Sequence, residues 1–144
     1  MADLIKITPD KERARSLLDT ISVRLDAIKL MQNTDAKKFS SKIVEEYYES
    51  VLELMTAIMS IDGFKTRSDA PGSHIAAIEY MHENYRELDD GEIGMIDDLR
   101  KKRVGITYYG RHVREDYIES NKKEIESIIE KLRAIAIKKL NKGE

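Results

Sequence analysis

The side chains best suited to binding an anion are concentrated in residues 100–114, which we call the basic segment. It contains six Lys or Arg residues and no Asp or Glu, whereas the other 129 residues carry a net charge of −8. Two adjacent tyrosines, Tyr108 and Tyr109, lie between its cationic ends. Cations neutralise phosphates and aromatic rings stack on bases, so the segment is a candidate surface for a nucleic acid. The same pattern is also typical of a solvated helix C-terminus, where cations oppose the helix dipole.

Arg103 has an unusual position in the helix that the pattern predicts over residues 92–109. The apolar residues of this helix recur at spacings of three and four: Ile93, Ile96, Leu99 and Ile106. At about 100° per residue, Arg103 falls in the middle of this apolar face. A buried guanidinium without a counter-charge is strongly destabilising. We therefore expect either a carboxylate from another helix, or a cleft or subunit boundary where an external anion binds.

The remaining helices follow from the same periodicity. The pattern predicts long helices over residues 9–31, 40–61, 92–109 and 115–139, and a short helix over residues 74–85. Their expected starts are Thr8 with Pro9, Ser40 or Ser41, Ser73 and the Asp89–Asp90–Gly91 run, and Gly110 is expected to end the fourth long helix in a left-handed cap. No strand-like alternation appears. The sequence thus predicts an all-α, antiparallel bundle of four long helices with one short inserted helix.

Length and composition favour a single domain over residues 1–144, with residues 1–8 and 141–144 as flexible ends. The absence of cysteine excludes disulfides, thiolate nucleophiles and cysteine-based zinc sites. The first residues do not resemble a signal peptide and no apolar run has membrane-spanning length, so we expect a cytoplasmic protein that does not enter a membrane. Abundant Lys, Glu and Ile fit a thermophile.

Several other polar residues have simple structural interpretations. The row Glu45, Glu46, Glu49 and Glu53 is expected to lie in water. Glu79 and His82 have the spacing found in di-iron bundles, but such sites need two such pairs and two further Glu residues, so we expect no metal and no cofactor. His74 is expected to be an exposed or first-turn residue, and Tyr47 and Tyr48 are expected to be packing residues.

Three local patterns, taken with the order of the helices, resemble a known family. They are Lys42-Ile-Val-Glu-Glu-Tyr-Tyr-Glu-Ser, Gly72-Ser-His-Ile and Leu99-Arg-Lys-Lys-Arg-Val-Gly-Ile-Thr-Tyr-Tyr-Gly. Over about residues 11–140 the chain resembles the HEPN domains, which are small all-helical proteins. The resemblance implies an RNase-like or RNA-binding scaffold, and a homodimer with its RNA site, including Arg103, along the cleft between the two copies.

HEPN domains that cleave RNA carry an Arg that is followed, after four to six residues, by a His. When the Arg is matched to Arg103, the His positions hold Tyr108, Tyr109 and Gly110, and the residue after the Arg is Val104. The nearest histidine is His112. The chain therefore resembles the family in its scaffold and departs from it at the catalytic histidine.

Three functions remain open. The first is an RNA-binding protein, with metal-independent endoribonuclease or toxin activity as an extension. In that case Arg103 would stabilise the phosphorane, His112 would transfer protons and Tyr108 would hydrogen-bond a phosphate. Tyr108 lies about 140° from Arg103 in a straight helix, so this pairing requires unwinding between Gly105 and Gly110. The RNA-binding residues would be Arg100, Lys101, Lys102, Tyr109, Arg111 and Arg114.

The second function is a non-catalytic interaction module that pairs with a protein such as a nucleotidyltransferase, which HEPN domains often accompany. The absence of the family's histidine favours it. The third is a pocket for a small ligand or nucleotide between helices, with Arg103 and Tyr109 as its polar and stacking groups.

Overall fold

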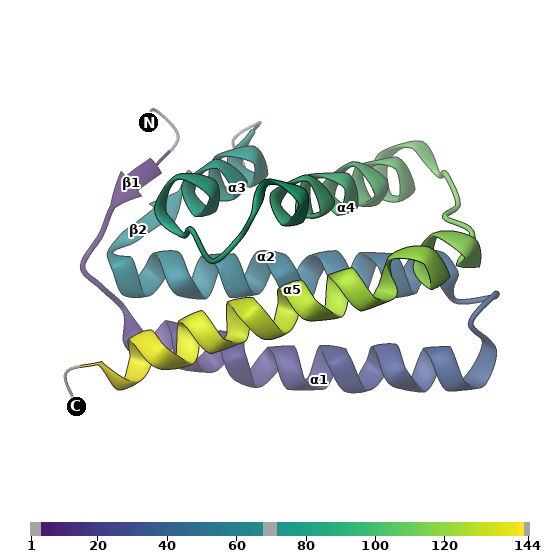
Figure 1. Cartoon of the computed structure of the whole chain (residues 1–144), viewed down its shortest axis with the longest axis horizontal. Helices are drawn as coiled ribbons and strands as arrows, with labels where there is room; N and C mark the ends of the chain where they lie inside the picture. The colour runs from purple at the N-terminus through teal and green to yellow at the C-terminus, as the bar shows by residue number, and fades with distance from the viewer. Residues whose placement is uncertain (1–3, 68–71, 143–144) are drawn as a thin grey trace.

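One helix, α2 (Ser40–Asp62), forms the centre of the molecule and the other elements cover it (Figure 1). The computed structural model describes residues 4–67 and 72–142. The elements around α2 are β1 (Leu4–Lys6), α1 (Lys11–Asp35), β2 (Phe64–Thr66), α3 (Ser73–Asn84), α4 (Asp90–Tyr109) and α5 (Glu115–Asn141). The predicted helical bundle of four long helices and one short helix is confirmed.

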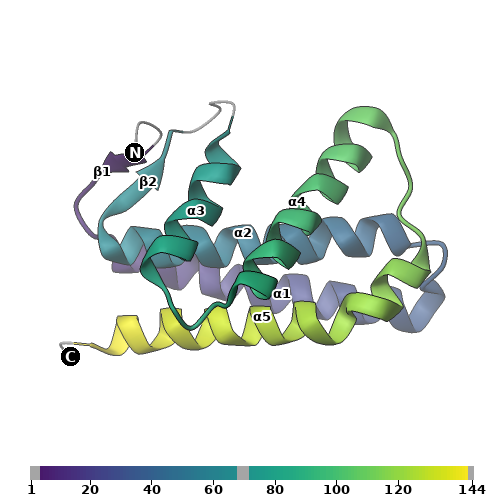
Figure 2. The same cartoon turned by 45° about the horizontal axis from the view of Figure 1, so that its top comes forward.

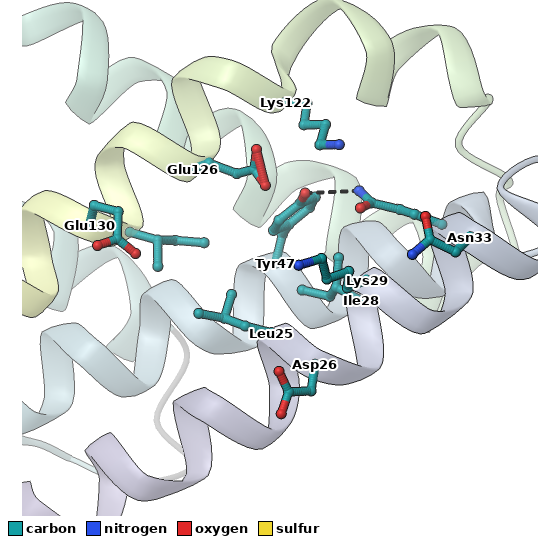
Figure 3. A pocket seen from close by; sticks show the side chains of 11 residues that line it. Leu25, Asp26, Ile28, Lys29, Asn33, Tyr47, Lys122, Glu126 and Glu130 are labelled. Carbon is teal, nitrogen blue, oxygen red and sulfur yellow. Dashed lines mark hydrogen bonds between the residues drawn. The ribbon is translucent and has the colours of Figure 1, made fainter.

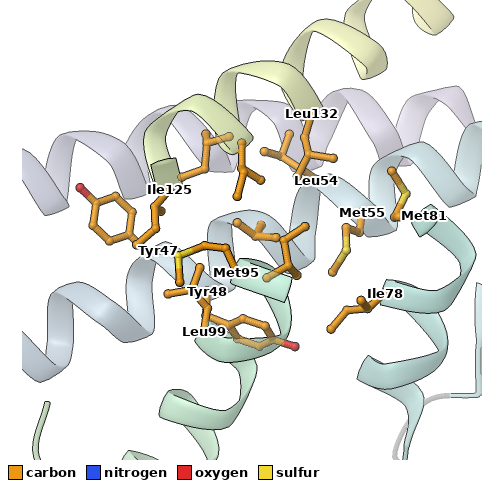
Figure 4. Close-up of a cluster of buried hydrophobic side chains, with 14 of the residues drawn as sticks. Tyr47, Tyr48, Leu54, Met55, Ile78, Met81, Met95, Leu99, Ile125 and Leu132 are labelled. Carbon is orange, nitrogen blue, oxygen red and sulfur yellow. The ribbon is translucent and has the colours of Figure 1, made fainter. Parts of the chain in front are cut away.

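The central place of α2 follows from its sequence, because apolar side chains occupy most of its circumference. A helix that is apolar nearly all round is stable only when it is buried. Figure 4 shows its residues meeting those of three other helices. The fully buried core includes Tyr47, Tyr48, Leu54 and Met55 of α2, Met81 of α3, Ile96 and Leu99 of α4, and Ile125 and Leu132 of α5.

Two short strands were not expected from the sequence. β1 pairs antiparallel with β2, with Leu4 opposite Thr66. The Ile7 N–H donates to the Gly63 carbonyl at 2.8 Å, and the Asp10 N–H donates to the Ser60 carbonyl at 2.9 Å. These bonds fix residues 4–10 to the end of α2. Residues 1–3 and 143–144, which belong to the ends expected to be flexible, lie outside the described residues. Alternation cannot reveal strands of three residues.

The predicted starts of three helices are corrected. The side chain of Asp10, not Thr8, caps α1 by accepting from the Arg13 N–H at 2.9 Å. Ser40 and Ser73 are the first helical residues of α2 and α3, not their caps. The Ser40 hydroxyl is used elsewhere, because it donates to the Val113 carbonyl at 2.6 Å.

Asp62 joins three helices at the end of α2. Its carboxylate accepts hydrogen bonds from the Tyr80 hydroxyl at 2.7 Å and from the Tyr85 hydroxyl, and it lies 2.7 Å from Lys139 Nζ of α5. A carboxylate is unfavourable at the negative end of a helix. The lysine and the two hydroxyls offset this cost and fix α3 and α5 against α2.

The N-terminal half of α4 is anchored by polar contacts. Asp89 and Glu92 form a capping box, in which each side chain accepts from the other residue's N–H. Glu92 also lies 2.8 Å from Lys131 Nζ of α5. The Tyr117 hydroxyl of α5 donates to Asp98 at 2.6 Å. From this anchored end, α3 and α4 diverge (Figure 2), so the C-terminal end of α4 stands away from α1 and α5.

Gly110 ends α4 in the left-handed conformation, with φ of 61°, as predicted. The chain then returns to the beginning of α2, where Val113 is buried. The Ser41 hydroxyl accepts from the Val113 N–H at 2.9 Å, while Ser40 binds the Val113 carbonyl. Residues 110–114 are thus tied to α2 by two consecutive serines.

None of the helices in the described ranges combines the length and the apolar run that a membrane span needs.

Gly63 and Gly72 allow a matched test of the turn after α2. Both have a positive φ, of 89° and 83°, but a Cβ on Gly63 would lie 3.0 Å from the Ile7 carbonyl oxygen, whereas a Cβ on Gly72 meets nothing within 4 Å. Gly72→Ala should lower the free energy of unfolding by about 1–2 kcal/mol from the left-handed backbone alone. Gly63→Ala should lower it further, because the hairpin must also shift. Urea denaturation measures both values, and equal losses would contradict the proposed clash.

Candidate anion-binding site

Arg103 lies half-buried on the side of α4 that faces α2. Its Nε is 3.4 Å from Glu49 Oε1, and its side chain is 23% exposed. Within residues 4–67 and 72–142, Arg103 donates no hydrogen bond that satisfies normal geometry. The carboxylate expected from another helix is therefore present, but it holds the guanidinium loosely and does not seal it from solvent. The guanidinium keeps donors for an external anion.

His74 belongs to the same surroundings and was not expected there. Its Nδ1 is 3.0 Å from the hydroxyl of Tyr48, and the two ring centroids are 5.7 Å apart. Burial lowers the pKa of His74, and the positive charges of Arg103 and Arg100 lower it further. Burial raises the pKa of Tyr48 well above its ordinary value. At neutral pH the pair is thus an uncharged imidazole next to an uncharged phenol.

Arg100 lies one helical turn before Arg103. Its Nε donates to Asp97 at 2.8 Å, and Lys101 Nζ is 3.3 Å from the same carboxylate. Burial acts to raise the pKa of Asp97, but the hydrogen bonds from Arg100 and Lys101 outweigh it and the pKa is lowered. We call Tyr48, Glu49, His74, Asp97, Arg100 and Arg103 the Arg103 cluster.

The Arg103 cluster has the groups that phosphate chemistry requires. Two guanidiniums can hold an anion, and a neutral imidazole can accept a proton. Half-burial strengthens these interactions, because charge–charge energies increase as the effective dielectric constant falls. The contact between His74 and Tyr48 could not be predicted from the sequence, because the two residues are 26 positions apart and lie on different helices.

The second part of the site is the end of α4, where Tyr108 and Tyr109 are 69% and 68% exposed. The guanidinium of Arg111 lies 5.2 Å from the centre of the Tyr109 ring. The Arg111 side chain packs against Gly105, and its Cδ lies 3.4 Å from the place where a Cβ on Gly105 would be. The Arg111 N–H also donates to the Gly105 carbonyl at 3.0 Å. We call Tyr108, Tyr109 and Arg111 the tyrosine platform.

The three residues expected to act together in catalysis do not meet. α4 stays helical through Tyr109, so the unwinding that would pair Tyr108 with Arg103 is absent. His112 lines a separate open groove of about 620 Å³. That groove also contains Arg114 and three lysines that sequence analysis did not single out: Lys37, Lys38 and Lys42. Lys102 lies over the Tyr117 ring, with its Nζ 5.2 Å from the ring centre.

The acidic row of α2 is not simply solvated. Arg24 of α1 donates to Glu53 at 2.6 Å from Nη2 and to Glu46 at 2.9 Å from Nη1. Glu49 contacts Arg103 instead. The expectation of free exposure to water is therefore wrong for Glu46, Glu49 and Glu53. Charge pairing between helices could not be read from the pattern of a single helix.

A small-ligand site built on Arg103 and Tyr109 has no support in their positions, because one faces α2 and the other is exposed. A pocket of about 320 Å³ lies elsewhere, between α1, α2 and α5 (Figure 3). The Tyr47 hydroxyl lies in this pocket and accepts from Gln32 Nε2 at 3.0 Å. Burial raises the pKa of Tyr47 to about 12. No group of three potential metal ligands occurs among the described residues.

Removing the Arg103 charge should change the titration of His74. Arg103→Gln should raise the pKa of His74 toward its ordinary value, because one positive charge that disfavours the imidazolium is lost. Lys101→Gln removes one charge from the same helix and should leave that pKa unchanged. NMR titration of the His74 ring measures both variants, and an unaltered pKa in Arg103→Gln would contradict the proposed proximity.

The same depressed pKa predicts how stability depends on pH. The unfolded chain protonates His74 near its ordinary pKa of about 6.5, while the folded chain resists protonation. The stabilisation from neutral His74 should therefore be complete above that pH and be lost as the pH falls toward the folded-state value.

No family model, no curated protein and no solved structure matches this chain. The HEPN resemblance, the homodimer around Arg103 and the nucleotidyltransferase-type partner accordingly stay predictions. The bundle and the positions of the Arg103 cluster and the tyrosine platform are the findings on which a function can be built.

Proposed function

We propose that this protein binds single-stranded RNA along α4, with bases on the tyrosine platform and a phosphate at the Arg103 cluster. The observation that carries the proposal is the exposure of Tyr108 and Tyr109, 69% and 68%, with the Arg111 guanidinium over the Tyr109 ring. Because both large aromatic rings are exposed at the helix end, packing within the chain does not account for them. Exposed rings next to cations are the usual platform for unpaired bases.

The Arg103 cluster is close enough to serve the same strand. Arg103 and Tyr108 are five residues apart on one helix, which corresponds to about 7.5 Å along its axis and about 140° around it, so the strand would pass partly around α4 between them. Among the described residues, the ion pair of Arg103 is the one with Glu49 at 3.4 Å, so a phosphate could take the remaining donors without breaking a strong ion pair. The resemblance to HEPN domains supports RNA as the nucleic acid.

Removing the two rings should weaken binding strongly. Tyr108→Ala with Tyr109→Ala should reduce the affinity for a fluorescent single-stranded RNA at least tenfold, since stacking contributes about 1–3 kcal/mol per base. The matched control replaces both residues with Phe, which keeps the rings and should keep most of the affinity. Fluorescence anisotropy at fixed salt measures the three proteins. Equal affinity of the Ala and Phe variants would contradict the platform.

A second candidate function, metal-independent RNA cleavage, is favoured by one observation, the neutral His74 near Arg103. In such a reaction His74 would take the proton of the 2′-hydroxyl. The 2′-oxygen would attack phosphorus to form a cyclic phosphate, and the 5′-oxygen would leave with a proton from water. Arg103 would stabilise the charge that develops on the phosphorane.

The cleavage reaction has a direct test. Labelled RNA incubated with the protein in EDTA should be cut, and His74→Asn or Arg103→Gln should reduce the rate at least a hundredfold, as for loss of an acid–base group or an electrostatic donor. His112→Asn should not change the rate, and a DNA strand of the same sequence should stay intact because it lacks the 2′-hydroxyl. RNA that binds but remains uncut would leave binding as the function and exclude cleavage.

A further inference from the structure

The outer face of α1 carries an uncharged stripe that the bundle does not use. Its residues recur at alternating spacings of four and three: Ser16, Thr20, Val23, Ala27, Leu30 and Thr34. Val23 and Leu30 are both 68% exposed. α1 has nine charged residues among its 25, and the same spacing continued toward the N-terminus reaches one of them, Arg13. We therefore define the α1 stripe as the six uncharged positions from Ser16 to Thr34.

The threonines of the α1 stripe present their methyl groups. The Thr20 hydroxyl donates to the Ser16 carbonyl at 3.2 Å, and the Thr34 hydroxyl donates to the Leu30 carbonyl at 2.7 Å. Because these hydroxyls are satisfied within the helix, the outward surface is more apolar than the sequence suggests. The buried residues of α1, Ala14, Ile21 and Ile28, lie on the opposite side and pack against the core.

Alternation of four and three is the repeat by which two helices pair along their length. A lipid surface fits this face poorly, because Glu12, Asp19 and Asp26 run along one flank of the stripe and would be repelled by anionic headgroups. The uncharged side chains of the α1 stripe and their spacing of four and three are instead suited to pairing with α1 of a second copy of this chain.

We propose that two copies of this chain pair in parallel through the α1 stripe. The acidic flank consists of Glu12, Asp19 and Asp26. In an antiparallel pair this flank would lie opposite the same acidic flank of the second chain, and the like charges would repel. In a parallel pair it faces the other flank, which consists of Leu17, Arg24 and Met31. The Arg24 side chain is held by Glu46 and Glu53 and is still 25% exposed.

This pairing differs from a homodimer built around Arg103. Because α2 packs against both α1 and α4 and lies between them (Figure 2), the tyrosine platforms of the two copies would face outward. Two outward sites let one dimer hold two segments of a long strand, and avidity then exceeds the affinity of a single site. The pairing itself does not depend on the RNA-binding proposal.

The chain contains no cysteine, so single-cysteine variants report the pairing without background. In the parallel dimer Val23 faces its own copy, and Val23→Cys should form a disulfide-linked dimer on mild oxidation. Ser22→Cys, one residue away and also exposed in the single chain, should stay largely monomeric. A mixture of Ser16→Cys and Thr34→Cys chains should form no mixed dimer; efficient mixed linkage would mean an antiparallel pair and overturn the proposal.

Sedimentation supplies the second measurement. The unmodified chain should be a dimer at micromolar concentration, and Val23→Glu with Leu30→Glu should make it a monomer with unchanged helical circular dichroism. Arg103→Gln should remain a dimer. A monomeric unmodified chain, or a dimer that survives both glutamates, would overturn the proposal.

Discussion

The burial of α2 is the constraint on which the rest of the structure depends. Because apolar residues occupy most of its circumference, every other helix has to contribute a face that covers it. Several polar groups on α2 then meet partners from the covering helices. Tyr48 and Glu49 are adjacent in sequence, and they meet His74 of α3 and Arg103 of α4. The candidate site is therefore assembled by the packing of the core.

The charges of this site are held in an intermediate environment. A fully buried guanidinium would need a strong carboxylate partner, and a fully exposed one would be weakened by solvent. Arg103 lies between these limits, with one loose contact and a side chain that is 23% exposed. Arg24 shows the other solution in the same molecule, since Glu46 and Glu53 both bind it closely. The guanidinium of Arg24 thus connects two helices, whereas that of Arg103 has hydrogen-bond donors available for another ligand.

Structural features that depend on neighbouring residues could be predicted from the sequence. The helical periodicity located all five helices, and Gly110 ended α4 in the left-handed conformation that glycine favours. Features that depend on a contact with a residue distant in the sequence could not be predicted. The cap of α1 is at Asp10 because Ile7 donates to the Gly63 carbonyl and Asp10 itself donates to the Ser60 carbonyl at the end of α2. The Tyr48–His74 pair also joins different helices, so no pattern within one helix could reveal it.

The connection between α4 and α5 has little spare length. Gly110 reverses the chain, Val113 is fastened to Ser40 and Ser41, and α5 starts at Glu115. Removing one residue here would have to release Val113 or unwind the first turn of α5, and adding one would produce a bulge without affecting either helix. This link should therefore tolerate insertions more readily than deletions, and the distance between the two helix ends sets its minimum length.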